Sequence, residues 1–359
     1  MAPTALQRPG SRVRSHVEEA DPARGAGRAG GRRRQEGHQV LSHALLCSAA
    51  AHRQHGAAWD AAAPGLRIIA FPDEGHLDDD LLAEISLAIF STDLWTTGQG
   101  RRFFRIALSA PNLRWLHVFA AGLDDPVFAE LARRGVRITG SAGSSAVAIA
   151  HTTVMHLLAL CRNARPLAVA QSEHRWAPVD HLDLEGRTVL IVGLGSIGRE
   201  IARLLPHFGV RVVGIRRSPD GSEPCPTYPV GRLHDVLREA DDVVVAASLD
   251  ETTRGIIGSS ELSLLPPHGH VVNVGRGELI DEAALVDALS AGKLRGAALD
   301  VFSSEPLSAD SPLWDMPNVI VTPHVAGRTP LSTERAAAVF ADNLGRWTRG
   351  EPLRNEFTP

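Results

Sequence analysis

A glycine-rich turn between an apolar run and an amphipathic segment constrains this chain more than any other feature. Residues 188–193 read TVLIVG, a continuous apolar run typical of a parallel strand that is buried on both faces. The sequence continues as GLGSIG, with Gly193, Gly195 and Gly198, and leads into a helix expected over 196–209. A strand, a glycine turn and a helix N-terminus in this order can hold a pyrophosphate, because free backbone N–H groups and the helix dipole favour an anion.

Each glycine in such a turn has its own function. The first allows the tight turn, the second lets the backbone approach the pyrophosphate, and the third lets the helix pack closely on the strand. Ser196 and Ile197 stand between the second and third glycines and belong to the same predicted cofactor site. The alternative, a glycine turn without a ligand, is disfavoured by the strand before the turn and the helix after it.

The stretch VVGIRRSPD, residues 212–220, lies where NAD and NADP are distinguished. Roughly 20 residues after a turn of this kind, a carboxylate usually accepts a hydrogen bond from the ribose 2′-hydroxyl of NAD. This chain has Arg216, Arg217 and Ser218 at that place, and guanidinium groups suit phosphate oxygens. We therefore predict NADP(H) as the cofactor, with NAD possible. The alternative is that both arginines are solvated and that Asp220 turns inward to serve NAD.

Strand-like and helix-like segments alternate from residue 66 onward, which predicts an α/β fold with parallel sheets. A strand is expected over 66–71, a helix over 78–90, and a long apolar connecting helix over 144–164. A last helix over 332–350 is expected to pack back on the first block. The predicted domains are therefore residues 65–150 with 330–359, and residues 151–329 as the dinucleotide-binding domain.

Residues 1–64 differ in composition from the rest of the chain. They are rich in Arg, Gly and Ala and show no periodic apolar face, so they bury too little surface to offset the entropy of ordering. We predict a disordered leader here. A targeting peptide is the alternative, but the acidic residues Glu18, Glu19, Asp21 and Glu36 argue against an acid-poor transit signal.

Composition excludes several classes of protein. The net charge of −4 gives no basic footprint for nucleic acid, and no apolar run reaches the roughly 18 residues of a membrane span. The three cysteines, Cys47, Cys161 and Cys225, lie far apart without CxxC spacing. We therefore expect no metal site and no disulfide framework, and a cytoplasmic, reducing location.

Three polar residues follow three predicted strands of the second block. Arg276 follows HVVNVG, Glu305 follows GAALDVF, and His324 ends NVIVTPH. Ligands of open α/β sheets bind at the carboxyl ends of strands, so the three side chains are expected to converge there. A histidine can protonate a developing alkoxide, a carboxylate beside it holds its orientation and favours its charged form, and an arginine binds a substrate carboxylate.

These stretches resemble those of the D-isomer-specific 2-hydroxyacid dehydrogenases. VGLGSIGREIA, ETTRGIIG, VVNVGRGELIDEAAL, GAALDVFSSEPL and PLWDMPNVIVTPHVAG occur in the order of that family, within a resemblance covering roughly 66–350. It implies two domains of flavodoxin-like and Rossmann type, a substrate domain and an NAD(P)-binding domain, with the active site in the cleft between them. It also implies a homodimer that reduces 2-oxo acids to D-2-hydroxy acids with NADH or NADPH.

The resemblance also assigns residues. Arg276, Glu305 and His324 occupy the family's catalytic Arg, Glu and His positions, and Asp300 occupies a position that usually contacts the nicotinamide carboxamide. The backbone of Ala121 and Gly122 matches the site that receives the substrate carboxylate.

Several functions are compatible with these residues. Glyoxylate or hydroxypyruvate is the favoured substrate, because arginines after the second strand accompany those activities in relatives. Phosphoglycerate and phosphonate dehydrogenases are alternatives within the family, whereas a formate dehydrogenase carries Gln where this chain has Glu305. From another class, a dinucleotide-sensing corepressor would keep the glycine turn without needing turnover.

Overall fold

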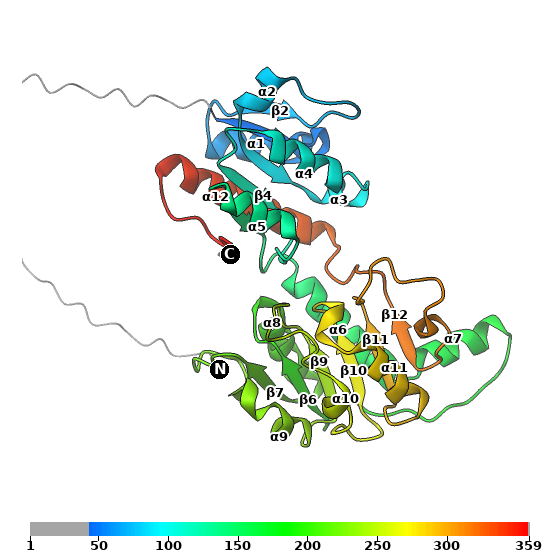
Figure 1. The fold of residues 1–359 in the computed structure, drawn as a ribbon. Helices are drawn as coiled ribbons and strands as arrows, with labels where there is room; N and C mark the ends of the chain where they lie inside the picture. Colours follow the sequence, from blue (N-terminus) through cyan, green and yellow to red (C-terminus); the bar gives the residue numbers. More distant parts are fainter. Residues whose placement is uncertain (1–42, 358–359) are drawn as a thin grey trace, which may run out of the picture. The chain divides into compact units, whose positions relative to one another are not determined.

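Two parallel sheets with helices on both faces make up the part of the chain that the structure describes, residues 43–357 (Figure 1). The structure is a computed structural model. The first sheet has the order β2-β1-β3-β4-β5 and the second the order β12-β11-β10-β9-β6-β7-β8, with every neighbouring pair parallel. This confirms the predicted α/β fold with two parallel sheets.

The first sheet is covered by two pairs of helices. Its strands are β1 (Ala44–Cys47), β2 (Arg67–Ala70), β3 (Ile85–Phe90), β4 (Trp115–Val118) and β5 (Arg137–Gly140). Helices α1 (Ala49–Ala62) and α12 (Pro330–Arg349) pack on one face through Trp59, Trp115 and Phe340. Helices α4 (Gly100–Ser109) and α5 (Pro126–Arg133) pack on the other face. The last long helix therefore contributes to the core of the first sheet.

The prediction of a disordered leader through residue 64 is wrong for its last third. Strand β1 is the second strand of the first sheet, between β2 and β3, and Leu45, Leu46 and Cys47 have no exposed surface. Ser48 caps α1 by accepting a hydrogen bond from the N–H of Ala51. A four-residue strand in Ala-rich sequence has little intrinsic signal, and its state is decided by neighbours distant in sequence. The remainder of the predicted leader, residues 1–42, lies outside the described residues.

The helix predicted over 78–90 is also wrong in its second half. Helix α2 (Asp79–Glu84) ends after six residues, and Ile85 begins β3 directly. The sequence ISLAIF is a short apolar run, which cannot be told from a buried helix by its periodicity. Pairing with β1 and β4 buries Ile85, Leu87 and Ile89 completely. The β-branched isoleucines favour the strand.

The second sheet is buried on both faces. Its strands are β6 (Thr188–Val192), β7 (Arg211–Arg216), β8 (Thr227–Pro229), β9 (Asp242–Val245), β10 (His270–Asn273), β11 (Gly296–Leu299) and β12 (Val319–Val321). Alternate residues of β6 face opposite sides: Leu190 and Val192 belong to one apolar cluster, and Val189 and Ile191 to another. This alternation explains why the strand reads as an uninterrupted apolar run.

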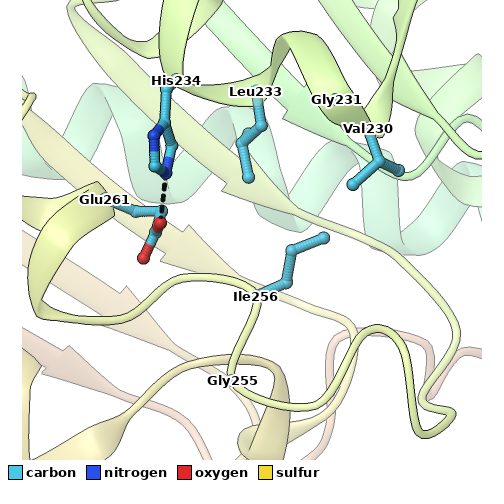
Figure 2. A pocket seen from close by; sticks show the side chains of 7 residues that line it. All are labelled: Val230, Gly231, Leu233, His234, Gly255, Ile256 and Glu261. Atoms are coloured by element: carbon cyan, nitrogen blue, oxygen red, sulfur yellow. Dashed lines mark hydrogen bonds and ion pairs between the residues drawn. The ribbon is translucent and has the colours of Figure 1, made fainter.

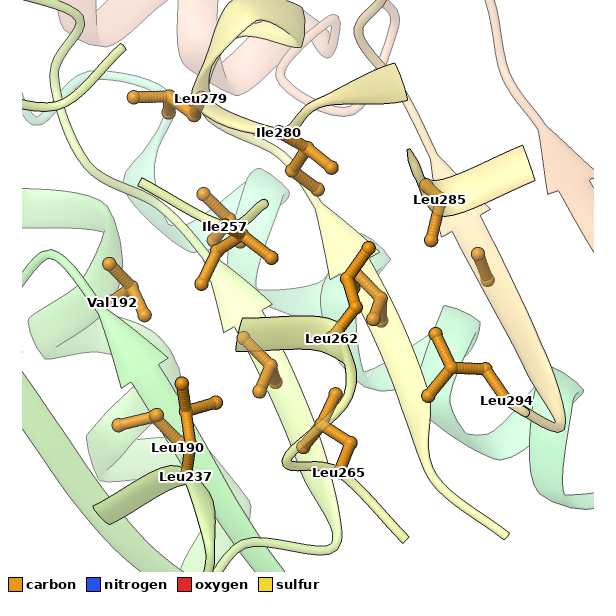
Figure 3. Packing of buried hydrophobic residues seen from close by; sticks show 14 of the residues in the cluster. Leu190, Val192, Leu237, Ile257, Leu262, Leu265, Leu279, Ile280, Leu285 and Leu294 are labelled. Carbon is orange, nitrogen blue, oxygen red and sulfur yellow. The ribbon is translucent and has the colours of Figure 1, made fainter. Parts of the chain in front are cut away.

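The helices of the second sheet divide between its two faces. One apolar cluster includes α9 (Leu233–Leu237), α10 (Ser259–Leu262) and α11 (Glu282–Ser290), as Figure 3 shows for Leu237, Leu262 and Leu285. The opposite cluster includes α6 (Ala146–Cys161) and α8 (Ser196–Leu204). Three further described elements are α3 (Thr92–Thr96), α7 (Ala164–Ser172) and the 3₁₀ turn η4 (Pro312–Trp314).

Candidate active site

The glycine turn after β6 has the geometry that a dinucleotide needs. Gly193 has φ +101°, and a Cβ there would lie 2.5 Å from the backbone of Ala247. A Cβ on Gly198 would lie 1.9 Å from the carbonyl oxygen of Gly193, so only glycine lets α8 pack this closely on the turn. A Cβ on Gly195, in contrast, would meet no atom within 4 Å. Gly195 and Ser196 are both exposed at the start of α8. These residues fit a bound pyrophosphate, because the exposed helix start offers N–H donors.

The two predicted phosphate-binding arginines both hold carboxylates in this structure. Arg216 donates to Asp220 at 2.9 Å and to Glu223 at 2.5 Å, and the side chain of Glu223 is only 2 % exposed. Arg217 pairs with Asp250 and donates to the hydroxyl of Thr252 at 3.1 Å. Arg217 is much the more exposed of the two, at 65 % against 33 % for Arg216. Sequence reasoning did not identify the acidic partners.

Asp220, the residue that the NAD alternative would use, is bonded within its own loop. Its Oδ1 accepts hydrogen bonds from the N–H and the hydroxyl of Ser222, and its Oδ2 accepts from Arg216. The bonds from Ser222, followed by that from Arg216, hold the pKa of this carboxyl well below its ordinary value. The carboxylate is therefore engaged within its own loop.

His324 and Glu305 form a hydrogen-bonded pair at the carboxyl ends of β12 and β11. The Nδ1 atom of His324 lies 2.8 Å from Oε2 of Glu305, and Oε1 of Glu305 accepts from the N–H of Phe302 at 3.1 Å. His324 has φ +52°, an uncommon conformation for a non-glycine residue that occurs preferentially where function fixes the backbone. Among residues 43–357, Nε2 of His324 has no hydrogen-bond partner, which leaves it available to a ligand.

The surroundings of Glu305 keep it ionised. Burial alone would raise the pKa of this carboxyl, but the hydrogen bond from His324 and the positive charges of His324 and Arg276 hold it below its ordinary value. An ionised carboxylate accepts a hydrogen bond from Nδ1–H and stabilises positive charge on the imidazole. The pair therefore has the arrangement of a proton donor supported by a carboxylate.

Asp300 is buried beneath the loop that carries His324. It is 2 % exposed, and its two oxygens accept hydrogen bonds from the hydroxyl of Thr322 and the N–H groups of Val325 and Ala326. Its carbonyl oxygen accepts from the N–H of His324 at 2.8 Å. These hydrogen bonds show that Asp300 fixes the loop that carries His324. The sequence did not indicate this role.

Arg276 reaches from the second sheet to the turn after β4 of the first sheet. Its guanidinium donates from Nε and from one terminal nitrogen to the two oxygens of Asp124, at 2.9 and 3.1 Å, and from the other terminal nitrogen to the carbonyl of Gly275. A Cβ on Gly122 would lie 1.6 Å from this guanidinium, so any other residue there would displace the end of the Arg276 side chain. The structure thereby brings Arg276 against the turn of Ala121 and Gly122.

Asp124 is the residue at this site that sequence reasoning missed. Burial by itself raises the pKa of Asp124, but the hydrogen bonds and charge of Arg276, with a smaller contribution from the charge of His324, hold it below its ordinary value. The available signal was its position, two residues after the predicted carboxylate-binding turn. Asp124 thus links the predicted substrate turn to the Arg276, Glu305 and His324 set.

Other features of the described chain lie apart from this set. A cavity of about 400 Å³ lies between η2 (Val230–Arg232), the start of α9 and the loop before α10, where His234 and Glu261 form a hydrogen bond (Figure 2). None of the predicted site residues line it.

Within residues 43–357 no cluster of three metal-ligating side chains is present, and no helix has the length and apolar character to cross a membrane.

Comparison with known proteins places the chain in a family. Residues 154–326 match the model of the D-isomer specific 2-hydroxyacid dehydrogenase, NAD binding domain. The chain is 32 % identical over 251 residues to a glyoxylate reductase from Thermofilum pendens, covering 68 % of this chain and 74 % of the relative.

Two solved structures are similar over most of the chain. A D-isomer specific 2-hydroxyacid dehydrogenase from Xanthobacter autotrophicus in complex with NADPH is 32 % identical, with a TM-score of 0.72 over 89 % of this chain and 98 % of that one. An NADPH-dependent glyoxylate/hydroxypyruvate reductase from Sinorhizobium meliloti is 29 % identical, with a TM-score of 0.71 over 88 % and 98 %. The fold, the NAD-binding domain and the relatives agree with the resemblance seen in the sequence, and the chain belongs to the D-isomer specific 2-hydroxyacid dehydrogenase family of NAD(P)-dependent oxidoreductases.

Proposed function

We propose that this protein reduces a small 2-oxo acid of the glyoxylate or hydroxypyruvate type to the D-2-hydroxy acid, with NADPH as the hydride donor. The observation that carries this proposal is the pair of His324 and Glu305, 2.8 Å apart, with Nε2 of His324 available to a ligand. Support also comes from the relatives, which include glyoxylate reductases and an NADPH-dependent glyoxylate/hydroxypyruvate reductase.

The proton in this reaction comes from His324. When bound, the nicotinamide supplies a hydride to the 2-oxo carbon, and negative charge develops on the oxygen attached to that carbon. The imidazolium of His324 donates its Nε2 proton to that oxygen, while Nδ1–H remains bonded to Glu305. Glu305 stays ionised and stabilises the charged ring before the transfer, so its function is to position and support the proton donor.

The substrate carboxylate binds between Arg276 and the turn of Ala121 and Gly122. Asp124 occupies Nε and one terminal nitrogen of the guanidinium and thereby fixes its plane. The two terminal nitrogens each retain an N–H for a second carboxylate, and the backbone of the turn lies against the same group. Arg276 in this position also stabilises the charge that develops on the neighbouring carbonyl oxygen.

The NADP preference rests chiefly on Arg217 and Ser218. Arg217 is paired with Asp250 at the surface, where an ion pair contributes only about 0–1 kcal/mol. A 2′-phosphate can replace that partner at little cost. Arg216 is held by the nearly buried Glu223 and orders the loop beside the phosphate. Asp300 contributes by fixing the loop that carries His324, and an oxygen of its carboxylate would accept a hydrogen bond from the carboxamide of a bound nicotinamide.

The test compares initial rates of NADPH and NADH oxidation with glyoxylate and with hydroxypyruvate. We expect turnover with NADPH and slower turnover with NADH. Arg276→Ala is expected to abolish reduction while fluorescence titration shows NADPH binding unchanged, and Arg254→Ala, a surface arginine paired only with Glu278 at 3.9 Å, serves as the control. Full activity in Arg276→Ala would disprove the site. NADPH binding without turnover of either acid would favour the corepressor alternative.

A homodimer is part of the proposal. Helix α7 and the segment after it expose large apolar side chains, with Trp176 96 % exposed, Val169 45 % and Val179 39 %. Apolar side chains gathered on one segment mark an interface, and a second copy of this chain is the partner we propose. Light scattering should give twice the chain mass for the native protein and a monomer for Trp176→Arg. A native monomer at micromolar concentration would contradict the proposal.

A further inference from the structure

A second cavity, with a largely apolar lining and five polar residues, lies at the amino ends of β10, β11 and β12. It has a volume of about 180 Å³, whereas one water needs roughly 10–15 Å³, so it has room for a four-oxygen anion. The end of α6 and the start of α7 close its other side. The lining residues that matter here are Asn163, Arg165, His270, Arg295 and Asn318.

Two buried polar atoms of these lining residues have no partner. The ring of His270 is 1 % exposed, and its Nε2 makes no hydrogen bond, while Nδ1 is bonded to Asp242 at 2.8 Å. The Nε atom of Arg295 is likewise buried and unpaired. Leaving one such group unsatisfied costs about 1–3 kcal/mol, and more for a charged group. Both atoms belong to residues that line the same cavity.

The cavity carries positive charge that nothing in the described chain neutralises. Arg295 has no carboxylate within ion-pair distance among residues 43–357, and neither has Arg165. Arg165 donates only to backbone carbonyls, those of Val319 and Trp314. No Asp or Glu lines the cavity.

The nearest buried carboxylate is already satisfied. Asp242 accepts two hydrogen bonds from Arg187 at 2.6 Å, besides the bond to His270. Arg187 therefore offsets the charge of Asp242, whereas Arg165 and Arg295 have no carboxylate partner among the described residues.

We propose that this cavity binds a small oxyanion, a phosphate or a carboxylate. The guanidinium of Arg295 donates from Nε to one oxygen, and Arg165 supplies the second positive charge. Nε2 of His270, whose Nδ1 is bonded to Asp242, supplies a further polar atom for the ligand.

The position of the cavity separates it from the candidate active site. The strands that begin at His270, Gly296 and Val319 are the same three whose carboxyl ends lead to Arg276, Glu305 and His324. The anion site therefore lies at the opposite edge of the sheet from the catalytic set. It binds its ligand independently of the substrate and the cofactor.

Crystals of the holoenzyme with NADPH, soaked in tungstate as a phosphate mimic, test the location directly. We expect an anomalous peak within hydrogen-bond distance of Arg295 and His270. Tungstate bound only elsewhere, or a side chain of a second copy filling the cavity, overturns the proposal.

Calorimetry in solution tests the chemistry with inorganic phosphate and, separately, with acetate. Arg295→Gln and Arg165→Gln should each weaken binding at least about tenfold, since each removes a charge-assisted contact. Arg162→Gln is the matched control, because Arg162 lies on the same segment but pairs with Asp183 outside the cavity. Loss of binding for phosphate alone, or for acetate alone, identifies the ligand class. Equal affinities in all variants, with unchanged circular dichroism, would exclude the site.

Discussion

Arg276 binds both carboxylate oxygens of Asp124, which joins the carboxyl edge of the second sheet to the turn after β4. The guanidinium predicted to receive the substrate is thus already oriented by a residue of the first sheet. Such a pair fixes the plane of the guanidinium, and a shift of about 1 Å in a positioning group can reduce rates by about two orders of magnitude.

Asp124→Asn should therefore raise the KM for the 2-oxo acid about tenfold, because the amide no longer holds both donors of Arg276. The KM for NADPH should stay the same. Asp125→Asn is the control, since Asp125 caps α5 and asparagine caps a helix equally well. An unchanged KM for the acid in Asp124→Asn, measured by steady-state kinetics, would remove Asp124 from the site.

Glu305→Gln should lower kcat for reduction about 100-fold, within the range of general acid–base catalysis. The neutral amide still accepts from Nδ1 of His324 but no longer stabilises the imidazolium. Glu278→Gln, whose carboxylate contacts only Arg254 at 3.9 Å, should keep the kcat of the wild type. An unchanged kcat in Glu305→Gln, measured by steady-state kinetics, would remove Glu305 from the catalytic set.

Arg217→Ala should raise the KM for NADPH more than tenfold, about 1.4 kcal/mol or more, while the KM for NADH stays the same. The exposed Arg217 exchanges Asp250 for the 2′-phosphate, which NADH lacks. Arg211→Ala is a suitable control, because Arg211 begins the same strand and pairs at 3.6 Å with Glu239. Equal losses for both cofactors would show that Arg217 supports the fold of the loop instead.

We expect the buried His117 to make the stability of the protein depend on pH below about 6.5. Burial lowers the pKa of His117 to about 3, and its ring nitrogens are hydrogen-bonded to Thr139 and Ser141. The unfolded chain binds a proton at this histidine below about pH 6.5, but the folded protein does not. The free energy of unfolding therefore falls as the pH decreases from about 6.5 to about 3.

At pH 5 this loss amounts to about 2 kcal/mol relative to pH 7. Urea unfolding of His117→Gln at the two pH values should show a loss smaller by that amount. His52→Gln, an exposed position on α1, should lose as much stability as wild type. Parallel losses in all three proteins would mean that His117 is not held neutral.

The second sheet was predictable because its local signals agree with its tertiary structure. The apolar run over 188–193 and the glycines after it define the strand and the turn by sterics alone, as Gly193 and Gly198 show. The convergence of Arg276, Glu305 and His324 followed from the rule that ligands bind at the carboxyl ends of parallel strands.

The first sheet was less predictable because its short strands depend on distant partners. The four residues Ala44–Cys47 become a strand only through pairing with β2 and β3. The ion pairs of Asp124, Glu223 and Asp250 join residues that are far apart in sequence or lie in loops, and periodicity carries no information about them.

The place of β1 between β2 and β3 limits how far this chain can be shortened. A protein that starts at residue 65, where the sequence first reads as globular, would lack an inner strand of a five-stranded sheet. Strand β2 would lose its neighbour, and β3 would become an open edge of unpaired N–H and C=O groups that favours aggregation. Trp59 of α1 would also be lost from its packing against Phe340. Expression of a truncated form should therefore begin no later than His43.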